Sequence, residues 1–373
     1  MELRDRKGAD MMTRRERLLA ALRGQEVDRI PWSPCMDGYY TSSLPEQGYD
    51  MDLIETMRFL RSDIMERHVP IVKEEVKGLS IREVVRGDTI TYEYVTPIGI
   101  LTEERKRSGR TIYRSRHLLR SVEHLKTYQY IVENTTYGPR FDEFLARDRF
   151  IGQDGLATPS GNLTPIQSLL QHLMGVEGVV YALADHPNEM NELLEVMHEQ
   201  NLESYRLLAE SPAHVVFTYE DTSTTVMSPA MYLSYSAPQL DEYADILHQG
   251  GKVFITHMCG KLKGFARLVG AGLMDGIDSL CPPTTGDLWA HEAREIWGEE
   301  KVIIGGIEPP ALVWMSVEET TRYVTDVLNQ MAPGRAFILS TGDAVAYGTP
   351  IENLLAITEV VERKGQYPLK KNY

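Results

Sequence analysis

The sequence predicts an α/β fold built on a parallel β-barrel, and three observations support that prediction. From about residue 150 onward, short apolar runs typical of buried strands alternate with amphipathic helical segments. These runs end in polar or reactive residues, and a parallel barrel assembles its functional site at the C-terminal ends of its strands. The length of 373 residues suits one elaborated barrel, because such barrels commonly need about 250 residues or more.

The N-terminal third of the sequence is less regular than the rest. Residues 1–12 are polar and are expected to be disordered, whereas residues 13–373 are predicted to form a single domain. Thr13 and Glu16 form a capping-box pattern at the start of an amphipathic helix. Residues 88–102 read as a β-hairpin turned near Pro97 and Gly99, which we interpret as part of an insertion over residues 81–120. Its Arg and Lys side chains favour solvated protection of an exposed edge over a basic ligand patch.

Five apolar runs in the C-terminal part are predicted to be consecutive strands, namely residues 213–221, 252–257, 276–280, 301–308 and 335–343. Because parallel strands end at the same rim of a barrel, the residues at their ends are candidates for one site. These candidates are Glu220, Asp221, His257, Cys259, Cys281, Glu308 and Asp343.

Composition excludes several classes of function. The formal net charge of -15 and the lack of a clustered basic surface argue against a nucleic-acid partner. Three cysteines without a pairing pattern fit a reducing compartment, so a cytoplasmic location is expected. No signal-peptide h-region and no run of about 18 apolar residues is found, so neither secretion nor a membrane span is expected.

The segment His257-Met258-Cys259-Gly260 contains the most informative spacing in the chain. Side chains at positions i and i+2 of an extended strand point the same way, so His257 and Cys259 can converge on one metal ion, and their donor atoms suit zinc. The alternative is a His and a Cys that are simply buried in the core, and spacing alone leaves the two interpretations even.

Four segments of the sequence carry a resemblance to known proteins. They are residues 13–31, residues 228–232, the tetrad that begins at His257, and residues 340–353. Together they resemble the uroporphyrinogen decarboxylase superfamily, a (β/α)8-barrel family that also includes zinc-dependent corrinoid methyltransferases. Their order and spacing imply a TIM barrel over most of the chain.

Two features bear on the position of the chain within that superfamily. Uroporphyrinogen decarboxylases carry an Arg-Gln-Ala-Gly-Arg motif shortly after the first helix, whereas residues 32–40 here read Trp-Ser-Pro-Cys-Met-Asp-Gly-Tyr-Tyr. Without those arginines a substrate with several carboxylates loses its bidentate partners, which disfavours decarboxylation of a porphyrinogen. The tetrad resembles that of methylcobamide:coenzyme M methyltransferases and favours methyl transfer.

That resemblance implies zinc held by His257, Cys259 and a third ligand at Asp343, where the relatives have Cys. A carboxylate there would give a more Lewis-acidic ion, suited to an ether oxygen as in O-demethylating relatives. Glu220 and Asp221 are predicted to take part in catalysis, because some of those relatives recruit acidic ligands upstream of the His. The alternatives are a loop or helix-capping role for Glu220 and Asp221 and a turn role for Asp343.

Substrate contacts are expected from two parts of the chain. Residues 150–163 read as a strand that leads into a loop, where Gln153 and Asp154 would fix a polar ligand. Tyr39, Tyr40 and Tyr219 would line an aromatic pocket, although partly buried tyrosines are more often ordinary core edge. Cys281 is expected to be packed and Cys35 to border the barrel mouth without a specific role.

The expected activity is zinc-dependent transfer of a methyl group between a methylated small molecule, such as a methoxylated aromatic, and a corrinoid (cobalamin) carried by a separate protein that docks transiently. One rival is a metal-free decarboxylase or lyase on the same fold. Another is a non-catalytic member that binds the corrinoid protein. Whether the chain forms a homo-oligomer is left open.

Overall fold

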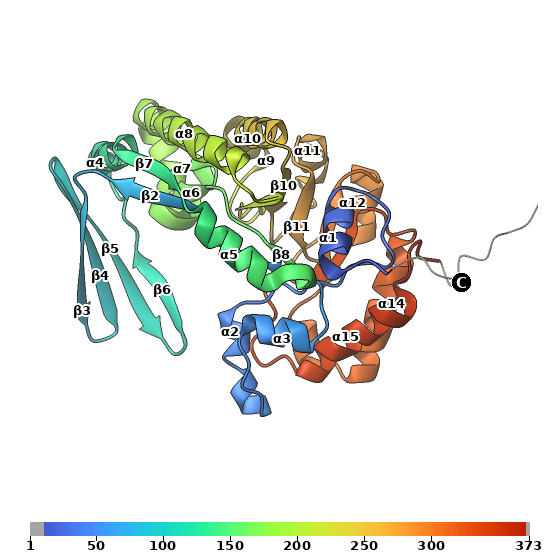
Figure 1. Ribbon diagram of the computed structural model, residues 1–373. Helices are drawn as coiled ribbons and strands as arrows, with labels where there is room; N and C mark the ends of the chain where they lie inside the picture. The colour runs from blue at the N-terminus through green and yellow to red at the C-terminus, as the bar shows by residue number, and fades with distance from the viewer. Residues whose placement is uncertain (1–10, 371–373) are drawn as a thin grey trace, which may run out of the picture.

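The computed structural model describes residues 11–370, and its centre is a set of parallel strands surrounded by helices (Figure 1). The barrel strands are β1 Ile64–Glu66, β8 Gly155–Ala157, β9 Val215–Tyr219, β10 Val253–His257, β11 Gly276–Leu280, β12 Val302–Ile307 and β13 Phe337–Thr341. The predicted strands of the C-terminal part are therefore confirmed as β9 to β13.

These strands form two parallel sheets, and isolated backbone bridges join the sheets around the barrel. One parallel sheet has the order β13-β12-β11-β10-β9 and a second pairs β1 with β8. A parallel bridge between Ser160 and Phe217 links the β8 side to β9, and another between Trp32 and Leu339 links the N-terminal segment to β13. The Asp63 N–H donates to the Trp32 carbonyl at 2.7 Å. The segment around Trp32 thus takes the place of the first strand, and the predicted (β/α)8 barrel is confirmed.

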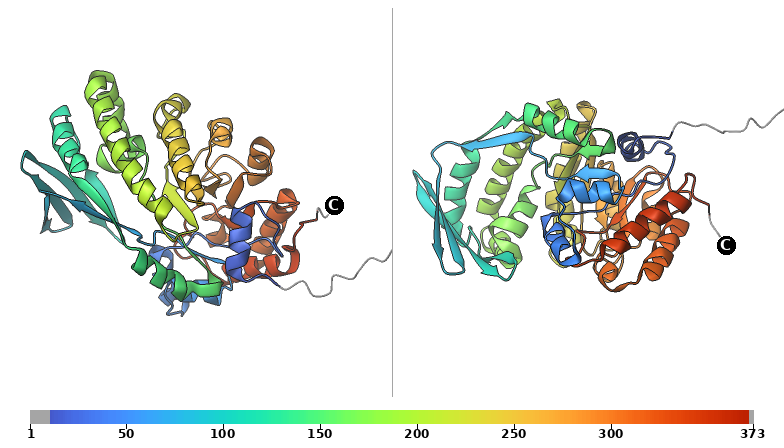
Figure 2. Two further views of the ribbon diagram at one scale, coloured as in Figure 1. Left: turned by 45° about the horizontal axis from the view of Figure 1, so that its top comes forward. Right: turned by 60° about the horizontal axis from the view of Figure 1, so that its bottom comes forward.

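Within the described residues, eight helices follow the eight strand positions along the chain and cover the outside of the barrel. They are α3 Leu53–Phe59, α5 Phe141–Ile151, α8 Pro187–Glu210, α10 Ala237–Gln249, α11 Ala266–Ala271, α12 Ala290–Trp297, α14 Val317–Met331 and α15 Ile351–Lys364. Figure 2 shows α8, α10, α11 and α12 side by side along one flank of the barrel.

Further helices lie in the connections between these strands and helices. They are α2 Gly38–Thr41, η1 Leu44–Gln47, α4 Val122–Glu133, η2 Gly152–Asp154, α6 Pro165–Ser168, η3 Leu169–Leu173, α7 Gly175–Asp185, α9 Pro229–Met231, η4 Tyr232–Ser236 and α13 Ala311–Trp314. No helix among residues 11–370 is both long and apolar enough to span a bilayer.

The insertion is larger than a hairpin. The predicted hairpin is β4 Thr89–Thr96 paired antiparallel with β5 Gly99–Ser108, and β3 Ser80–Arg86 and β6 Thr111–Arg116 extend it to four strands. A two-stranded ribbon of β2 Val72–Val76 and β7 Thr135–Pro139 connects this sheet to the barrel. The sheet stands away from the barrel at one end of the molecule (Figure 1).

The apolar core has two layers, as period-2 strands between a barrel interior and surrounding helices require. An inner cluster gathers Val215, Phe217, Val253 and Ile255 with neighbouring strand residues, and an outer cluster packs the strands against the helices. The helix α1 Arg14–Leu22, which begins with the predicted capping box of Thr13 and Glu16, adds its buried face to the inner cluster. It therefore closes the N-terminal end of the barrel. Of the expected disordered residues 1–12, positions 1–10 lie outside the described residues.

Candidate active site

Three polar side chains meet across adjacent strands at the C-terminal end of the barrel. His257 is paired in register with Tyr219 on β9 and with Asp278 on β11. Val253 and Ile255 belong to the inner cluster, so alternation turns His257 inward as well. The barrel interior therefore changes from apolar to polar at this level.

His257 is fixed by a buried carboxylate. Its Nδ1 lies 2.8 Å from Asp278 Oδ2, and Asp278 is fully buried. The second oxygen of Asp278 accepts from Arg67 Nη2 at 2.6 Å. Burial opposes the charge on Asp278, but Arg67 and His257 outweigh it and hold the pKa of Asp278 below its ordinary value. An ionised Asp278 accepts the Nδ1–H, which leaves Nε2 as the imidazole nitrogen with a lone pair.

The backbone next to Arg67 and Asp278 adopts unusual conformations. The pairing of β11 with β12 shifts register between Ile277 and Leu280, and Ser279 within the bulge has a φ of 64°. His68, which follows Arg67, has a φ of 60°. Left-handed conformations are uncommon for residues other than glycine and tend to occur at functional sites. Asp278 lies inside this irregular stretch, and bulges commonly re-aim a side chain.

Cys259 lies beside two carboxylates at the same rim. Its Sγ is 3.8 Å from Asp221 Oδ1. Burial raises the pKa of the Cys259 thiol to about 12, and the nearby charges of Asp343 and Asp221 act in the same direction. Burial also raises the pKa of Asp221. Among the described residues neither Asp221 nor Asp343 forms an ion pair, so this side of the site has excess negative charge.

Gly260 allows the chain to turn after Cys259. It has a φ of +93°, and a Cβ at this position would lie 2.9 Å from the Ser223 hydroxyl. Ser223 Oγ accepts from the Lys261 N–H at 3.1 Å and so fastens the loop after β10 to the loop after β9. The glycine of the tetrad therefore serves the geometry of the loop that carries Cys259.

The chemistry of these groups fits zinc, although the ligands are not assembled around one point. Two ligands of a tetrahedral zinc, a thiolate and a carboxylate oxygen, lie about 3.5 Å apart, close to the spacing of Cys259 and Asp221. The lone pair of His257 Nε2 and the carboxylate on Nδ1 match the way zinc-binding histidines are held. Within residues 11–370, however, no three His, Cys, Asp or Glu side chains already converge as metal ligands.

Aromatic rings border the His257 side of the site. The Tyr219 ring stacks on His68 with a centroid distance of 3.9 Å and lies 5.0 Å from the His257 ring. Tyr39 lies in α2, after the first strand, is 43 % exposed and packs 5.1 Å from Tyr347. Tyr40 is fully buried and donates to the Thr349 carbonyl, which is the alternative core role. Tyr219 and Tyr39 thus remain candidates to contact a ligand.

Glu220 does not face this site, although the sequence predicts a part in catalysis for it together with Asp221. The side chains of β9 alternate, so Glu220 points outward when Tyr219 and Asp221 point inward. Its carboxylate accepts the Thr164 N–H and the Thr164 hydroxyl, each at 2.7 Å. Thr164 is the N-cap residue of α6, so Glu220 holds the residue from which this helix starts, a helix that precedes β9 in the chain. Asp221 stays in the site.

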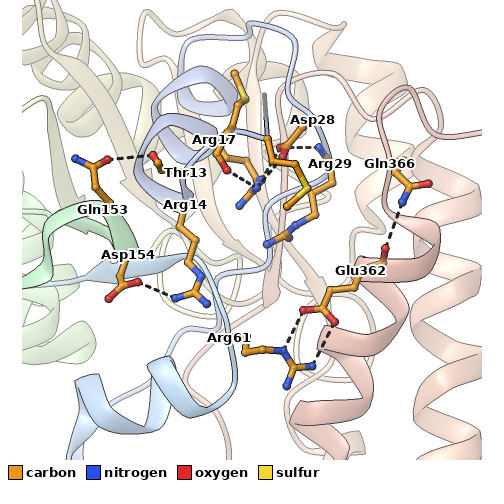
Figure 3. Close-up of a pocket in the computed structure, with 12 residues that line it drawn as sticks. Thr13, Arg14, Arg17, Asp28, Arg29, Arg61, Gln153, Asp154, Glu362 and Gln366 are labelled. Carbon is orange, nitrogen blue, oxygen red and sulfur yellow. Dashed lines mark hydrogen bonds and ion pairs between the residues drawn. The ribbon is translucent and has the colours of Figure 1, made fainter. Parts of the chain in front are cut away.

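Gln153 and Asp154 also lie elsewhere, because they precede β8 at the opposite end of the barrel. Figure 3 shows them with α1, where Asp154 binds Arg14 and Gln153 accepts from Thr13. They line a cavity of about 720 Å³ at this N-terminal end. They therefore do not lie beside His257, and their predicted contact with a polar ligand stays a prediction. The short strand begins after them, whereas the sequence placed them at its end.

The two other cysteines have different surroundings. Cys281 is buried and donates to Glu308 Oε2 at 3.1 Å, which agrees with a packed side chain. Cys35 is buried near Arg67, and burial raises the pKa of its thiol to about 12. Neither thiol contacts Cys259 or His257 through a hydrogen bond in the described part of the chain.

Arg67, His68 and Asp278 were missed by the sequence analysis. A signal existed for the first two, because the apolar pair Ile64 and Met65 is directly followed by polar residues, as in the later strands. The signal for Asp278 was an acidic residue inside an apolar strand, which is rare unless it is paired.

Comparison with known proteins assigns the family. The family profile described as Uroporphyrinogen decarboxylase (URO-D) matches residues 159–364, more than half of the chain. The chain therefore belongs to the uroporphyrinogen decarboxylase family. It is 24% identical over 201 residues to uroporphyrinogen decarboxylases from the Dugway 5J108-111 and RSA 493 strains of Coxiella burnetii. The match covers 51% of this chain and 53% of each relative, so the chain spans about half the length of the curated relatives it matches.

A solved structure supports the barrel over nearly the whole chain. A methyltransferase from Methanosarcina mazei superposes with a TM-score of 0.63 and covers 94% of this chain and 99% of its own, at 16% sequence identity. At that identity the likeness concerns the fold. The barrel described above is thus of a known type.

Proposed function

We propose that this protein is a zinc-dependent methyltransferase that moves a methyl group between a methylated small molecule and a corrinoid carried by a separate protein. The observation that supports it best is the arrangement of His257, with Nδ1 held by Asp278 and Nε2 left available, next to the Cys259 and Asp221 pair. The solved neighbour named a methyltransferase points to the same class.

His257, Cys259 and Asp221 would hold the ion, with Asp343 as a further carboxylate at the rim. Bound zinc would supply Lewis acidity toward the heteroatom that carries the methyl group. Asp278 keeps the His257 ring in one orientation, and Arg67 keeps Asp278 ionised. Asp221 and Asp343 provide negative charge that a divalent cation neutralises, and coordination would deprotonate the Cys259 thiol despite its raised pKa.

Tyr219 and the exposed Tyr39 would contact the methylated molecule, which we propose to be a methoxylated aromatic. The Tyr219 ring is fixed by its stack on His68, so it presents a constant surface next to the His257 ring.

A turnover assay tests this proposal. The protein, loaded with zinc, is mixed with a reduced corrinoid protein and methoxybenzoates or methoxyphenols, and methylation of cobalt is followed by its absorbance change. We expect a methylated corrinoid and a demethylated product with the wild type and with the control variant Cys281→Ser. The Cys281 thiol is a suitable control because it donates a hydrogen bond to Glu308 and is not part of the proposed zinc site. His257→Ala and Cys259→Ser should lose at least about 100-fold in rate, in keeping with loss of a metal ligand. Equal rates in all four proteins would contradict the proposal.

A further inference from the structure

Arg67 is a buried cation with unused hydrogen-bond donors. Its side chain is 7% exposed, and only Nη2 has a partner, the Asp278 carboxylate. Nε and Nη1 are buried and form no hydrogen bond with the described residues. Leaving a charged donor buried and unsatisfied is costly, so an arrangement of this kind indicates that an acceptor is missing.

The position of Arg67 places these donors at the candidate site. Met65 belongs to the inner cluster, so alternation along the chain turns Arg67 inward too. Its guanidinium lies 5.9 Å from the centre of the Phe217 ring, also in that cluster. The guanidinium contacts Asp278, and Asp278 in turn contacts His257, so a single side chain lies between Arg67 and the His257 ring.

Two further donors without partners among the described residues lie at the ends of the first and last strands. Ser33 and Ser340 are fully buried, and their hydroxyl oxygens form no hydrogen bond. The bridge from Trp32 to Leu339 makes these two serines neighbours in register, and both face inward because Leu339 packs in the outer cluster. The barrel mouth thus combines a buried cation with unpartnered hydroxyls.

We propose that Arg67 binds a carboxylate of the substrate, so that the small molecule handled at this site is a monoanionic carboxylic acid. This inference rests on the site of the proposed function and deepens it. A carboxylate offers the planar oxygen acceptors that guanidinium N–H groups match. A dianion such as a phosphate monoester is disfavoured, because Asp278 already balances Arg67 and the Asp221 and Asp343 carboxylates lie at the same rim.

Binding of benzoate and of its neutral isostere benzamide tests the inference. Both are titrated by calorimetry into the wild-type protein as isolated and again after treatment with EDTA, in a buffer free of chloride and carboxylates. We expect benzoate to bind at least about tenfold more tightly than benzamide in both states, because a charge-assisted hydrogen bond is strong when water is excluded. Equal affinities would overturn the inference, and so would a preference that disappears with EDTA, since that carboxylate would have bound a metal.

Variants assign the preference to the side chain. Arg67→Met should abolish the benzoate preference, Arg67→Lys should keep only part of it, and the exposed Arg61→Met at the opposite end should keep all of it. A folded Arg67→Met protein, checked by circular dichroism, that still prefers benzoate would overturn the inference. If Arg67→Met does not fold, the test uses Arg67→Lys. A folded Arg67→Lys protein that keeps the full benzoate preference would then overturn the inference. Zinc binding and methyl transfer are measured separately, so either can fail while the carboxylate preference stands.

Discussion

His257 owes its orientation to one side chain on β11 and to another just after β1. Asp278 holds Nδ1, and Arg67 holds Asp278 from the residue that follows β1. All three groups are largely buried, so their charges interact more strongly than they would in water. Removing one of these side chains should therefore lower the stability of the fold and loosen the His257 ring, which we propose to bind zinc.

The variant Asp278→Asn tests whether Asp278 neutralises Arg67 and supports His257. The amide cannot neutralise Arg67, and leaving a buried charge without its partner costs about 3–5 kcal/mol. We expect the free energy of unfolding in urea to fall by that amount, and zinc affinity, measured against a chromophoric chelator, to fall about 10–100-fold. An unchanged free energy of unfolding would show that Asp278 is not the counter-ion of Arg67.

The helix α6 lies in the connection after β8, and Glu220, the residue that follows β9, binds its N-cap residue Thr164. Burial raises the pKa of Glu220 to about 7, although the hydrogen bonds from Thr164 act in the opposite direction. The unfolded chain releases this proton near the ordinary pKa of 4.5, whereas the folded chain keeps it until about 7. The folded state thus binds more protons in this window, and its stability falls as the pH rises from 4.5 to 7.

Glu220→Gln should remove this pH dependence. The contribution of Glu220 between pH 4.5 and 7 amounts to about 3 kcal/mol, so the variant should lose less stability than the wild type over that range. Unfolding in urea at several pH values between about 5 and 8 measures the difference. Parallel stability curves for the two proteins would show that the carboxyl is not held neutral. Because Glu220 faces away from His257, methyl transfer by the variant should stay near the wild-type rate.

At the scale of the whole molecule, the two ends of the barrel have different roles. The C-terminal end carries the polar groups, while α1 seals the N-terminal end with fully buried side chains such as Leu18. Leu18→Ala should lower the free energy of unfolding by about 2–5 kcal/mol and leave the zinc content of the folded protein unchanged. Loss of zinc from the folded variant would contradict this division of roles.

The sequence predicted the repeated strands well because each apolar run is short, buried and followed by polar residues, as β9 to β13 show. It failed where one residue of register decides the outcome. Glu220 and Asp221 are adjacent, yet one faces a helix and the other faces the site. Arg67 and Asp278 could not be joined from sequence, because they are 211 positions apart and meet only when the barrel closes.

The most direct test of the account is the zinc content of the purified protein, measured by elemental analysis after loosely bound ions have been removed with a chelator. Wild type, His257→Ala, Cys259→Ser and the control Cys281→Ser are prepared identically. We expect about one zinc per chain in the wild type and the control, and none in the two site variants. A wild-type protein that binds no zinc even after reconstitution, or site variants that keep their zinc, would show that His257 and Cys259 do not form a zinc site.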